Sequence, residues 1–538
     1  ADVKAQASAD NYRNVYQIFT QSFCDSDNDG VGDFKGIISQ LDYLNDGDPN
    51  AGDDLGVDGI WLTPIMPSKS YHKYDVENYY DIDPDLAKDV PERMKEFENL
   101  VQRTHKAGLK VIIDFVPNHV ARQYHSDSKP AGVRDLGEDD DTSCSFSPQN
   151  NFYYLHSEQL HLDNILQGST YQEVPAKATG NDNFTSWPNR NDWYETIKLN
   201  YGIDIISGRQ VHFCPTPDTW QKMLQILLYW ASKGIDGFRC DMAEMVPVEF
   251  WEWALPQVKT AYPNIVFIAE VYNPALYRDY IHRGKFDYLY DKVGLYDTLL
   301  NVCRGQSTQS ITSCWQSVDD IREHMLNFLE NHDEQRLASD FLLGCGEKAL
   351  PALLVSSLMP SPFMLYFGQE LGERGMDEEG FSGRDGRTTI FDYWSVDTLR
   401  RWKGNGDYKG EQLTDDEKAL QKFYARLLNL CNSEAALSKG VFYGLQYANP
   451  HCDSYDSNHL FSYLRGDENE LLLIVTNFSN EEKKCSVTIP EEAFAFFGIS
   501  QDNDVHNAVE LLTEEALQLP LNPCDKIDVT VPANSGVI

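Results

Sequence analysis

Short apolar runs alternate with longer amphipathic segments over roughly the first 430 residues of the chain. In Phe97–Ala107 and Trp220–Ser232 the apolar residues recur at helical spacing, which predicts helices. The runs expected to form strands are Val15–Phe23, Gly59–Ile65, Lys110–Val116, Gly237–Met242, Val266–Tyr272, Tyr288–Asp291, Leu326–Glu330 and Phe363–Phe367. Strands that alternate with helices in this way predict an α/β fold, a (β/α)8 TIM barrel rather than an open sheet.

One interval of the barrel pattern is too long for a simple crossover. About 100 residues, rich in Asn, Asp, Pro, Gly and aromatic side chains, separate Val116 from Trp220. Phe152–Leu155, Trp187 and Trp193–Tyr194 can supply a small core. We therefore expect an inserted domain at residues 118–215, with the barrel formed by residues 1–117 and 216–430.

The pattern changes again after about residue 430, where short β-type runs are separated by polar turns. These runs are Leu460–Leu464, Leu471–Asn477, Cys485–Ile489 and Ile527–Val531. They predict a C-terminal antiparallel β-sandwich at residues 431–538. No pair of exposed tryptophans is evident there, so we expect this domain mainly to cover the barrel.

The charge balance restricts the kinds of partner. Asp and Glu number 84 against 45 Lys and Arg, which gives a formal net charge of −39. Such a surface repels nucleic acid and anionic membranes but admits a neutral ligand or polymer. No apolar run reaches the ~18–20 residues that a membrane span needs. Aromatic residues make up 12% of the chain, which suits the C–H faces of sugars but also fits a large core.

The first residue is Ala1, which is compatible with a removed signal peptide or a trimmed tag. The 11 cysteines show no C-x-x-C metal spacing. Cys303 and Cys314 are close enough in sequence to bridge, but the pairing cannot be deduced from the sequence.

Charged side chains stand where the predicted strands end, which is the active-site face of a barrel. Arg239 and Asp241 are two positions apart on one strand, so they point the same way. Glu270 ends the next strand, and His332 and Asp333 end a later one. Each alone has a structural explanation, such as an ion pair or a solvated strand end. Their convergence on one face indicates a catalytic site.

Four motifs in order identify the chain as resembling the α-amylase family, glycoside hydrolase family 13. They are Asp114-Phe-Val-Pro-Asn-His119, Gly237-Phe-Arg-Cys-Asp241, Ile268-Ala-Glu270 and Asn331-His-Asp333. Supporting matches are Gly59-Ile-Trp-Leu-Thr-Pro64, Tyr71-His-Lys-Tyr-Asp75 and Tyr366-Phe-Gly-Gln-Glu370. The resemblance covers nearly the whole chain.

The resemblance implies a role for each residue. Asp241 would be the nucleophile, Glu270 the general acid/base and Asp333 the stabiliser of the oxocarbenium-like transition state. Arg239 would keep Asp241 ionised, and Asp114 would brace the site. The residues expected to bind substrate are Tyr74, Asp75, His119, Trp187, Arg239, Tyr272 and His332. Two carboxyl groups about 5–5.5 Å apart across a glycosidic bond would give double displacement with retention.

The loop Asp25-Ser-Asp-Asn-Asp-Gly-Val-Gly-Asp33 carries carboxylates at alternate positions, as the start of an EF-hand does. Gly36 stands where an EF-hand has its final Glu, so this is not an EF-hand. Hard oxygen ligands at this spacing suit Ca²⁺. The loop resembles the calcium loop of oligo-1,6-glucosidase- and neopullulanase-type relatives. That resemblance implies structural Ca²⁺ bound by Asp25, Asp27, Asp29, Asp33 and the Val31 carbonyl.

A second calcium, between barrel and insertion, is common in the family and uses the Asn that matches Asn118 and a His that is Met245 here. Glu244 also replaces the usual Lys, so the sequence predicts no second calcium. In the insertion, Ile197-Lys-Leu-Asn200 has Lys198 where the family usually has Asp, which departs from the motif that marks subfamily specificity.

The resemblance favours a secreted endo-acting α-amylase, its signal peptide removed, that acts as a monomer on starch or maltooligosaccharides. A neopullulanase, α-glucosidase or 4-α-glucanotransferase on the same scaffold is the alternative, and a catalytically inactive glucan-binding protein is a remote one. Because all three acids are present, the remote alternative is disfavoured.

Overall fold

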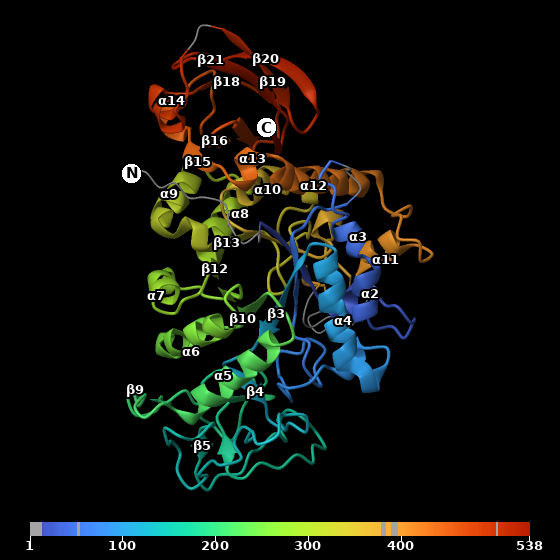
Figure 1. The fold of residues 1–538 in the computed structure, drawn as a ribbon, viewed down its shortest axis with the longest axis vertical. Helices are drawn as coiled ribbons and strands as arrows, with labels where there is room; N and C mark the ends of the chain where they lie inside the picture. Colours follow the sequence, from blue (N-terminus) through green and yellow to red (C-terminus); the bar gives the residue numbers. More distant parts are fainter. Residues whose placement is uncertain (1–12, 51–53, 378–383, 389–395, 502–503) are drawn as a thin grey trace.

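The computed structural model describes residues 13–50, 54–377, 384–388, 396–501 and 504–538 (Figure 1). The barrel occupies the middle of the molecule, with the inserted segment at one end and the C-terminal β-domain at the other. None of the helices in these ranges has the length and apolarity that a bilayer span requires.

Eight parallel strands form a closed barrel in the order β1-β14-β13-β12-β11-β10-β3-β2, which confirms the predicted fold. The strands are β1 (Asn14–Ile18), β2 (Gly59–Leu62), β3 (Lys110–Phe115), β10 (Gly237–Cys240), β11 (Val266–Ala269), β12 (Tyr288–Tyr290), β13 (Met325–Phe328) and β14 (Phe363–Tyr366). Almost every strand residue is buried, because helices cover the outside and side chains fill the inside. This is why the strands appear in the sequence as continuous apolar runs.

The predicted strand Val15–Phe23 was wrong in its second half. β1 ends at Ile18, and Thr20–Phe23 form the short helix α1. A short apolar run does not distinguish a buried strand from a buried helical turn, because both lack a polar face. The other predicted strands extend one to three residues too far at their C-terminal ends, where the chain turns to present its functional side chains.

Helices surround the barrel (Figure 1), and the longest of them bury one apolar face. In α4 (Arg93–Lys106), Phe97, Leu100 and Val101 are buried. The last turn of this helix carries basic residues, and positive charge is favourable near the negative end of the helix dipole. The other helices of at least 14 residues are α5 (Asp218–Ala231), α6 (Val248–Ala261) and α12 (Asp415–Ser433), and α10 is Leu350–Leu358. The shorter helices are α2 (Phe34–Ser39), α3 (Leu41–Leu44), α7 (Tyr277–His282), α8 (Asp297–Cys303), α9 (Gln309–Ser317), α11 (Asp397–Lys403), α13 (Ala435–Ser438) and α14 (Glu491–Phe497).

The segment between β3 and α5 contains three small antiparallel pairs. They are β4 (His119–Ala121) with β7 (Thr196–Lys198), β5 (Tyr154–Leu155) with β6 (Ala176–Lys177), and β8 (Ile203–Asp204) with β9 (Gln210–Val211). This segment has a small apolar core of its own, which is formed by Leu155, Leu160, Leu162 and Ala176. The boundaries assigned to this domain stay a prediction.

The C-terminal domain is antiparallel, as predicted. One sheet contains β15 (Val441–Gly444), β16 (Leu460–Gly466), β17 (Leu471–Asn477) and β22 (Ser535–Val537); the pairs are β18 (Lys483–Thr488) with β21 (Lys526–Val531) and β19 (Val505–Glu510) with β20 (Glu515–Pro520). Leu464 and Val475 lie in its separate apolar core.

Buried contacts join this domain to the barrel. Arg465 of β16 is fully buried and donates to the carbonyls of Leu358, Leu437 and Gly440. Tyr463 donates its hydroxyl to the Leu354 carbonyl at 2.6 Å. The end of helix α10 is therefore covered by β16 rather than by solvent.

All of the cysteines in the described part of the chain are free, so Cys303 and Cys314 do not bridge. The Cys314 thiol lies 2.9 Å from the Thr298 hydroxyl instead.

Candidate active site

Two of the predicted catalytic acids follow adjoining barrel strands directly. Cys240 of β10 pairs in register with Ala269 of β11, so Asp241 and Glu270 come next at the same edge. Both side chains are buried, whereas the Asp333 side chain, beyond β13, is 38% exposed. The structure thus brings the acids together at the C-terminal ends of the strands, where barrel enzymes have their sites.

Arg239 is the centre of this cluster and has no exposed surface. Its Nη1 lies 2.8 Å from Asp241 Oδ1 and 3.1 Å from Asp114 Oδ1. Its Nη2 donates to Glu270 Oε2, and its Nε donates to the Tyr290 hydroxyl at 3.0 Å. One guanidinium therefore fixes the orientation of three carboxyl groups by charge-assisted hydrogen bonds.

One cation cannot neutralise three buried carboxylates, so the cluster retains protons. Burial raises the pKa of Glu270 well above its ordinary value, and the nearby Asp241 and Asp333 charges add to the effect against the opposing Arg239. Burial also raises the pKa of Asp114 to about 7, although Arg239 opposes this. A protonated Glu270 beside an arginine-bound Asp241 is the division of labour that an acid and a nucleophile need.

His332 is held between a strand amide and the third acid. Gln17 Nε2 of β1 lies 2.9 Å from His332 Nδ1, and His332 Nε2 lies 3.3 Å from Asp333 Oδ2. An amide donor on Nδ1 assigns the ring proton to Nε2. Burial, with the Arg239 charge, lowers the pKa of His332 well below its ordinary value, so the ring is a neutral donor. The Tyr74 ring is stacked on His332 with a centroid distance of 5.1 Å and an angle of 12°.

The other predicted histidine is bonded to the protein through both ring nitrogens. His119 Nε2 lies 2.9 Å from the Tyr74 carbonyl, and its Nδ1 lies 3.1 Å from Asn118 Nδ2. Tyr74 in turn donates its hydroxyl to Asp114 at 2.7 Å. His119 and Tyr74 thus support the floor of the site, and their contacts with a sugar stay predictions.

The three remaining predicted substrate residues lie in different surroundings. Asp75 is buried and accepts hydrogen bonds from the hydroxyls of Ser68 and Ser70. Tyr272 is half-buried two residues beyond Glu270. Trp187 is 51% exposed on the insertion, where it is stacked on His161 with centroids 3.9 Å apart. Tyr272 lies close to the acids, because the charges of Glu270 and Asp333 add to the effect of burial in raising its pKa. Sugar contacts by Asp75, Tyr272 and Trp187 stay predictions.

Two residues of the site were missed from the sequence. Gln17 orients His332, and Tyr290 holds Arg239. Both are buried polar groups inside apolar strand runs, and a polar group in that position needs a partner. A polar side chain inside an apolar run drew attention to Asp114 in the sequence, and the same signal was present at Gln17.

A buried lysine joins the barrel to the insertion. Lys198 of β7 donates to Asn118 Oδ1 and lies 3.0 Å from Asp182 Oδ1. Its ammonium group therefore occupies the oxygen-lined junction between the end of β3 and the insertion. A fixed cation there accords with the expectation of no second calcium, which itself stays a prediction.

Replacing Lys198 by methionine is expected to lower the free energy of unfolding by about 2 kcal/mol, because Asn118 loses a charge-assisted partner in a buried site. Urea denaturation of the Lys198→Met protein would measure the loss. The matched control is Lys484→Met, which removes an exposed lysine on β18. Equal stability of the two variants would contradict a structural role for Lys198.

The acidic loop after α1 brings three carboxylates together. Oxygen atoms of Asp25, Asp27 and Asp29 lie within 4.8 Å of one another. Asp33 has a different environment, because it accepts from the Gly36 N–H at 2.7 Å as the N-cap of α2. The donor set, all hard carboxylate oxygens, fits Ca²⁺.

A (β/α)8 barrel with two carboxyl groups bound to one buried arginine at its active-site face has the groups that glycoside hydrolysis by two carboxylates requires. The sequence profile described as the alpha-amylase catalytic domain matches residues 17–440. The chain therefore belongs to the α-amylase family, glycoside hydrolase family 13, and is an enzyme of that family.

Relatives of several activities resemble the chain to the same extent. It is 26% identical to alpha-amylase 3 of Dictyoglomus thermophilum, over 88% of this chain and 86% of that protein. It is also 26% identical to an alpha-glucosidase of Apis mellifera, over 90% of this chain and 88% of that protein. The crystal structure of an alpha-amylase from H. orenii shares the fold, with a TM-score of 0.67 and 23% identity over 97% and 98% of the two chains.

Proposed function

We propose that the protein is an endo-acting α-amylase that hydrolyses internal α-1,4-glucosidic bonds of starch and maltooligosaccharides with retention of configuration. The observation that carries the proposal is the joint binding of Asp241 and Glu270 by Arg239. Arg239 orients Asp241 for attack, and burial raises the pKa of Glu270, so that Glu270 holds the proton that the departing sugar needs.

The reaction proceeds in two displacements. Asp241 attacks the anomeric carbon while Glu270 gives its proton to the departing glycosidic oxygen, so the glucan chain leaves as an alcohol. Glu270, now a carboxylate, removes a proton from water, and the resulting hydroxide displaces Asp241 from the sugar. Each group ends in its starting protonation state.

The neighbours of the acids act on the sugar between these steps. Positive charge develops on the ring near the transition state, and the half-exposed Asp333 carboxylate can stabilise it. His332 donates from Nε2 beside Asp333, which suits a hydrogen bond to a sugar hydroxyl. Such hydrogen bonds accelerate the reaction only if they are stronger to the flattened ring of the transition state than to the ring of the bound substrate.

Neopullulanase, α-glucosidase and 4-α-glucanotransferase activities remain the alternatives, because relatives with each of these names match the chain. They share the covalent intermediate and differ in the bond presented and in the acceptor that reaches the intermediate. An inactive glucan-binding protein is disfavoured by the complete set of acids and by their arrangement around Arg239.

A chromatographic time course of products from amylose and from pullulan distinguishes these activities. Mixed maltooligosaccharides appearing early from amylose, with pullulan intact, are expected for an endo α-1,4 hydrolase. Panose from pullulan would identify a neopullulanase, and products longer than a supplied maltooligosaccharide would identify a transferase. Glucose as the sole early product would identify an α-glucosidase.

We further propose that Asp25, Asp27, Asp29 and the Val31 carbonyl hold a structural Ca²⁺, with Asp33 fixing the loop on α2. Removal of calcium with EDTA is expected to lower Tm by several degrees, because an ion that binds only the folded state stabilises it. Added Ca²⁺ should restore Tm, and the Asp27→Asn/Asp29→Asn protein should not respond. Asp42→Asn, which removes an exposed acid on α3, is the control. An unchanged Tm in EDTA would contradict the proposal.

Neutral α-glucans are the partners that the strongly negative chain admits. Secretion and a monomeric state stay predictions from the sequence.

A further inference from the structure

A short stretch of chain beyond β14, residues 384–388, is hydrogen-bonded to the loop that carries Asp333. The Arg336 N–H donates to the Gly386 carbonyl at 2.7 Å, and the Arg336 Nε donates to the Thr388 hydroxyl at 2.7 Å. Both donors belong to the loop that follows β13. These two bonds place segment 384–388 beside the third acid of the site.

Arg336 anchors this segment to the ends of two barrel strands. Its side chain is buried, and its Nη1 lies 2.7 Å from Glu330 Oε1, just beyond β13. Its Nη2 donates to the Phe367 carbonyl, which follows β14 directly, at 2.8 Å. The position of segment 384–388 therefore depends on the barrel strands themselves.

Arg387 reaches from this segment to Asp333. Its Nε donates to the Asp333 carbonyl at 3.1 Å, and its Nη1 lies 3.4 Å from Asp385 Oδ2. The Arg387 side chain is half-buried, at 36% exposed. The guanidinium group is thus held at two points, one of which is the main chain of the third acid.

The charge of Arg387 also acts on the Asp333 carboxyl group. Burial raises the pKa of Asp333, and the charges of Arg239 and Arg387 oppose that rise. Arg239 already binds three other carboxyl groups, whereas Arg387 bonds directly to the Asp333 residue. Asp333 has to be ionised if it is to stabilise positive charge on the sugar.

Other titratable and charged groups face Asp333 as well. His332 Nε2 lies 3.3 Å from its Oδ2. The others, from the surrounding elements, are His72, Tyr74, Arg239, Glu270, Tyr272 and Glu334. Substitution of Arg387 leaves all of these groups in place, so a pH effect of that substitution reports the loss of the Arg387 charge.

We propose that Arg387 is a positioning residue for the third acid. It fixes the main chain of Asp333 through the Nε hydrogen bond and supplies a cation that favours the ionised carboxylate. The inference rests on the proposed function, because it takes Asp333 as the group that stabilises the charge developing on the sugar.

The test measures kcat/KM on α-maltosyl fluoride against pH for the unsubstituted, Arg387→Met and Arg387→Lys proteins. This substrate needs no proton from Glu270, so the fall of activity at low pH reports the carboxylates that must be ionised. Loss of the cation raises the pKa of Asp333, so Arg387→Met should move this fall to higher pH by roughly 0.5–1 unit. Its plateau should drop about two- to tenfold, the loss expected for one hydrogen bond. Arg387→Lys keeps the charge and should leave the fall near its original pH.

The matched control is Arg384→Met. Arg384 belongs to the same segment, but it is 53% exposed and lies 3.4 Å from Asp340. This variant should keep the plateau and the pH of the fall, and Tm should show that every variant is folded. A fall at the unsubstituted pH in Arg387→Met would overturn the proposal. So would an equal shift in Arg387→Lys, because the charge would then have no effect.

Failure of the proposed function has a different signature. If the unsubstituted protein consumes maltosyl fluoride but not amylose, the endo-acting assignment fails, while a shifted profile in Arg387→Met still supports the inference. Amylose degradation together with an unshifted profile gives the reverse. No reaction with either substrate would overturn both.

Discussion

Replacing Asp241 by asparagine is expected to lower kcat on amylose by on the order of 10⁴-fold or more, as removal of a nucleophile does in other covalent enzymes. The amide is nearly the same size as the carboxylate but cannot form the glycosyl ester. The amide oxygen would still accept a hydrogen bond from Arg239, so the fold should persist. Release of reducing ends from amylose measures the loss.

The matched control is Asp279→Asn, which removes an exposed carboxylate on α7 and should keep full activity. Tm of the Asp241→Asn protein should show that it is folded. A residual activity within tenfold of the unsubstituted enzyme would mean that Asp241 is not the nucleophile.

Replacing Glu270 by glutamine is expected to slow the reaction of some substrates much more than others, depending on whether the leaving group needs a proton. Loss of a general acid costs about 10²–10⁴-fold on maltoheptaose, whose departing sugar needs a proton. Maltosyl fluoride needs no such proton, so its first step should remain fast. Water then lacks a base, and the glycosyl-enzyme should accumulate as a mass adduct on the peptide that contains Asp241.

The pH dependence gives an independent readout. The active form of Glu270 is protonated, and burial raises its pKa, so activity on maltoheptaose should persist above the ordinary carboxyl range and fall as pH rises through that pKa. Glu270→Gln should abolish this alkaline fall in the slower single-turnover cleavage of maltoheptaose. Glu244→Gln, which alters an acceptor of the Tyr272 N–H, should keep the unsubstituted profile. An unchanged profile in Glu270→Gln would exclude Glu270 as the acid.

The barrel was predictable because its strands are buried on both faces and its helices on one. The spacing of apolar residues distinguishes a helix from a buried strand over long segments, as in α4 and α5. It fails over short ones, and so Thr20–Phe23 was assigned to a strand although it is a helix. The position at which a strand ends depends on contacts with other strands, which the local pattern does not contain.

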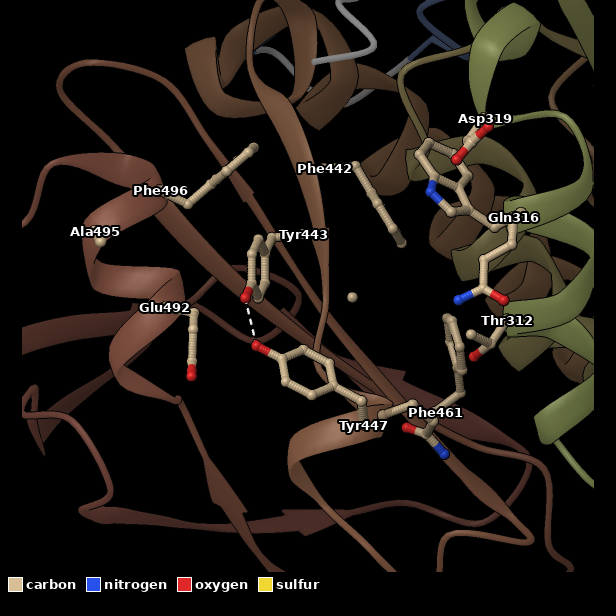
Figure 2. A pocket seen from close by; sticks show the side chains of 13 residues that line it. Thr312, Gln316, Asp319, Phe442, Tyr443, Tyr447, Phe461, Glu492, Ala495 and Phe496 are labelled. Atoms are coloured by element: carbon tan, nitrogen blue, oxygen red, sulfur yellow. Dashed lines mark hydrogen bonds between the residues drawn. The ribbon is translucent and has the colours of Figure 1, made fainter. Parts of the chain in front are cut away.

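The acids of the site were predictable because a charge at the end of an apolar strand is costly unless it has a function or a partner. Their partners were harder to predict. Gln17 and His332 are 315 residues apart, and only closure of the barrel brings them together. Lys198 was noticed as a departure, but its contact with Asp182 depends on the path of the insertion. The pocket between the barrel and the last domain is lined by Trp315 and Tyr447, which are distant in sequence, so neither segment reveals it alone (Figure 2).

The covered end of helix α10 limits how far the enzyme can be treated as interchangeable modules. Arg465 reaches from the last domain to the Leu358 carbonyl, and Tyr463 bonds to Leu354. A chain cut after the barrel would leave those carbonyls and the apolar residues around them without cover. Recombination with other barrels or other β-domains must therefore exchange α10 and β16 together as one unit.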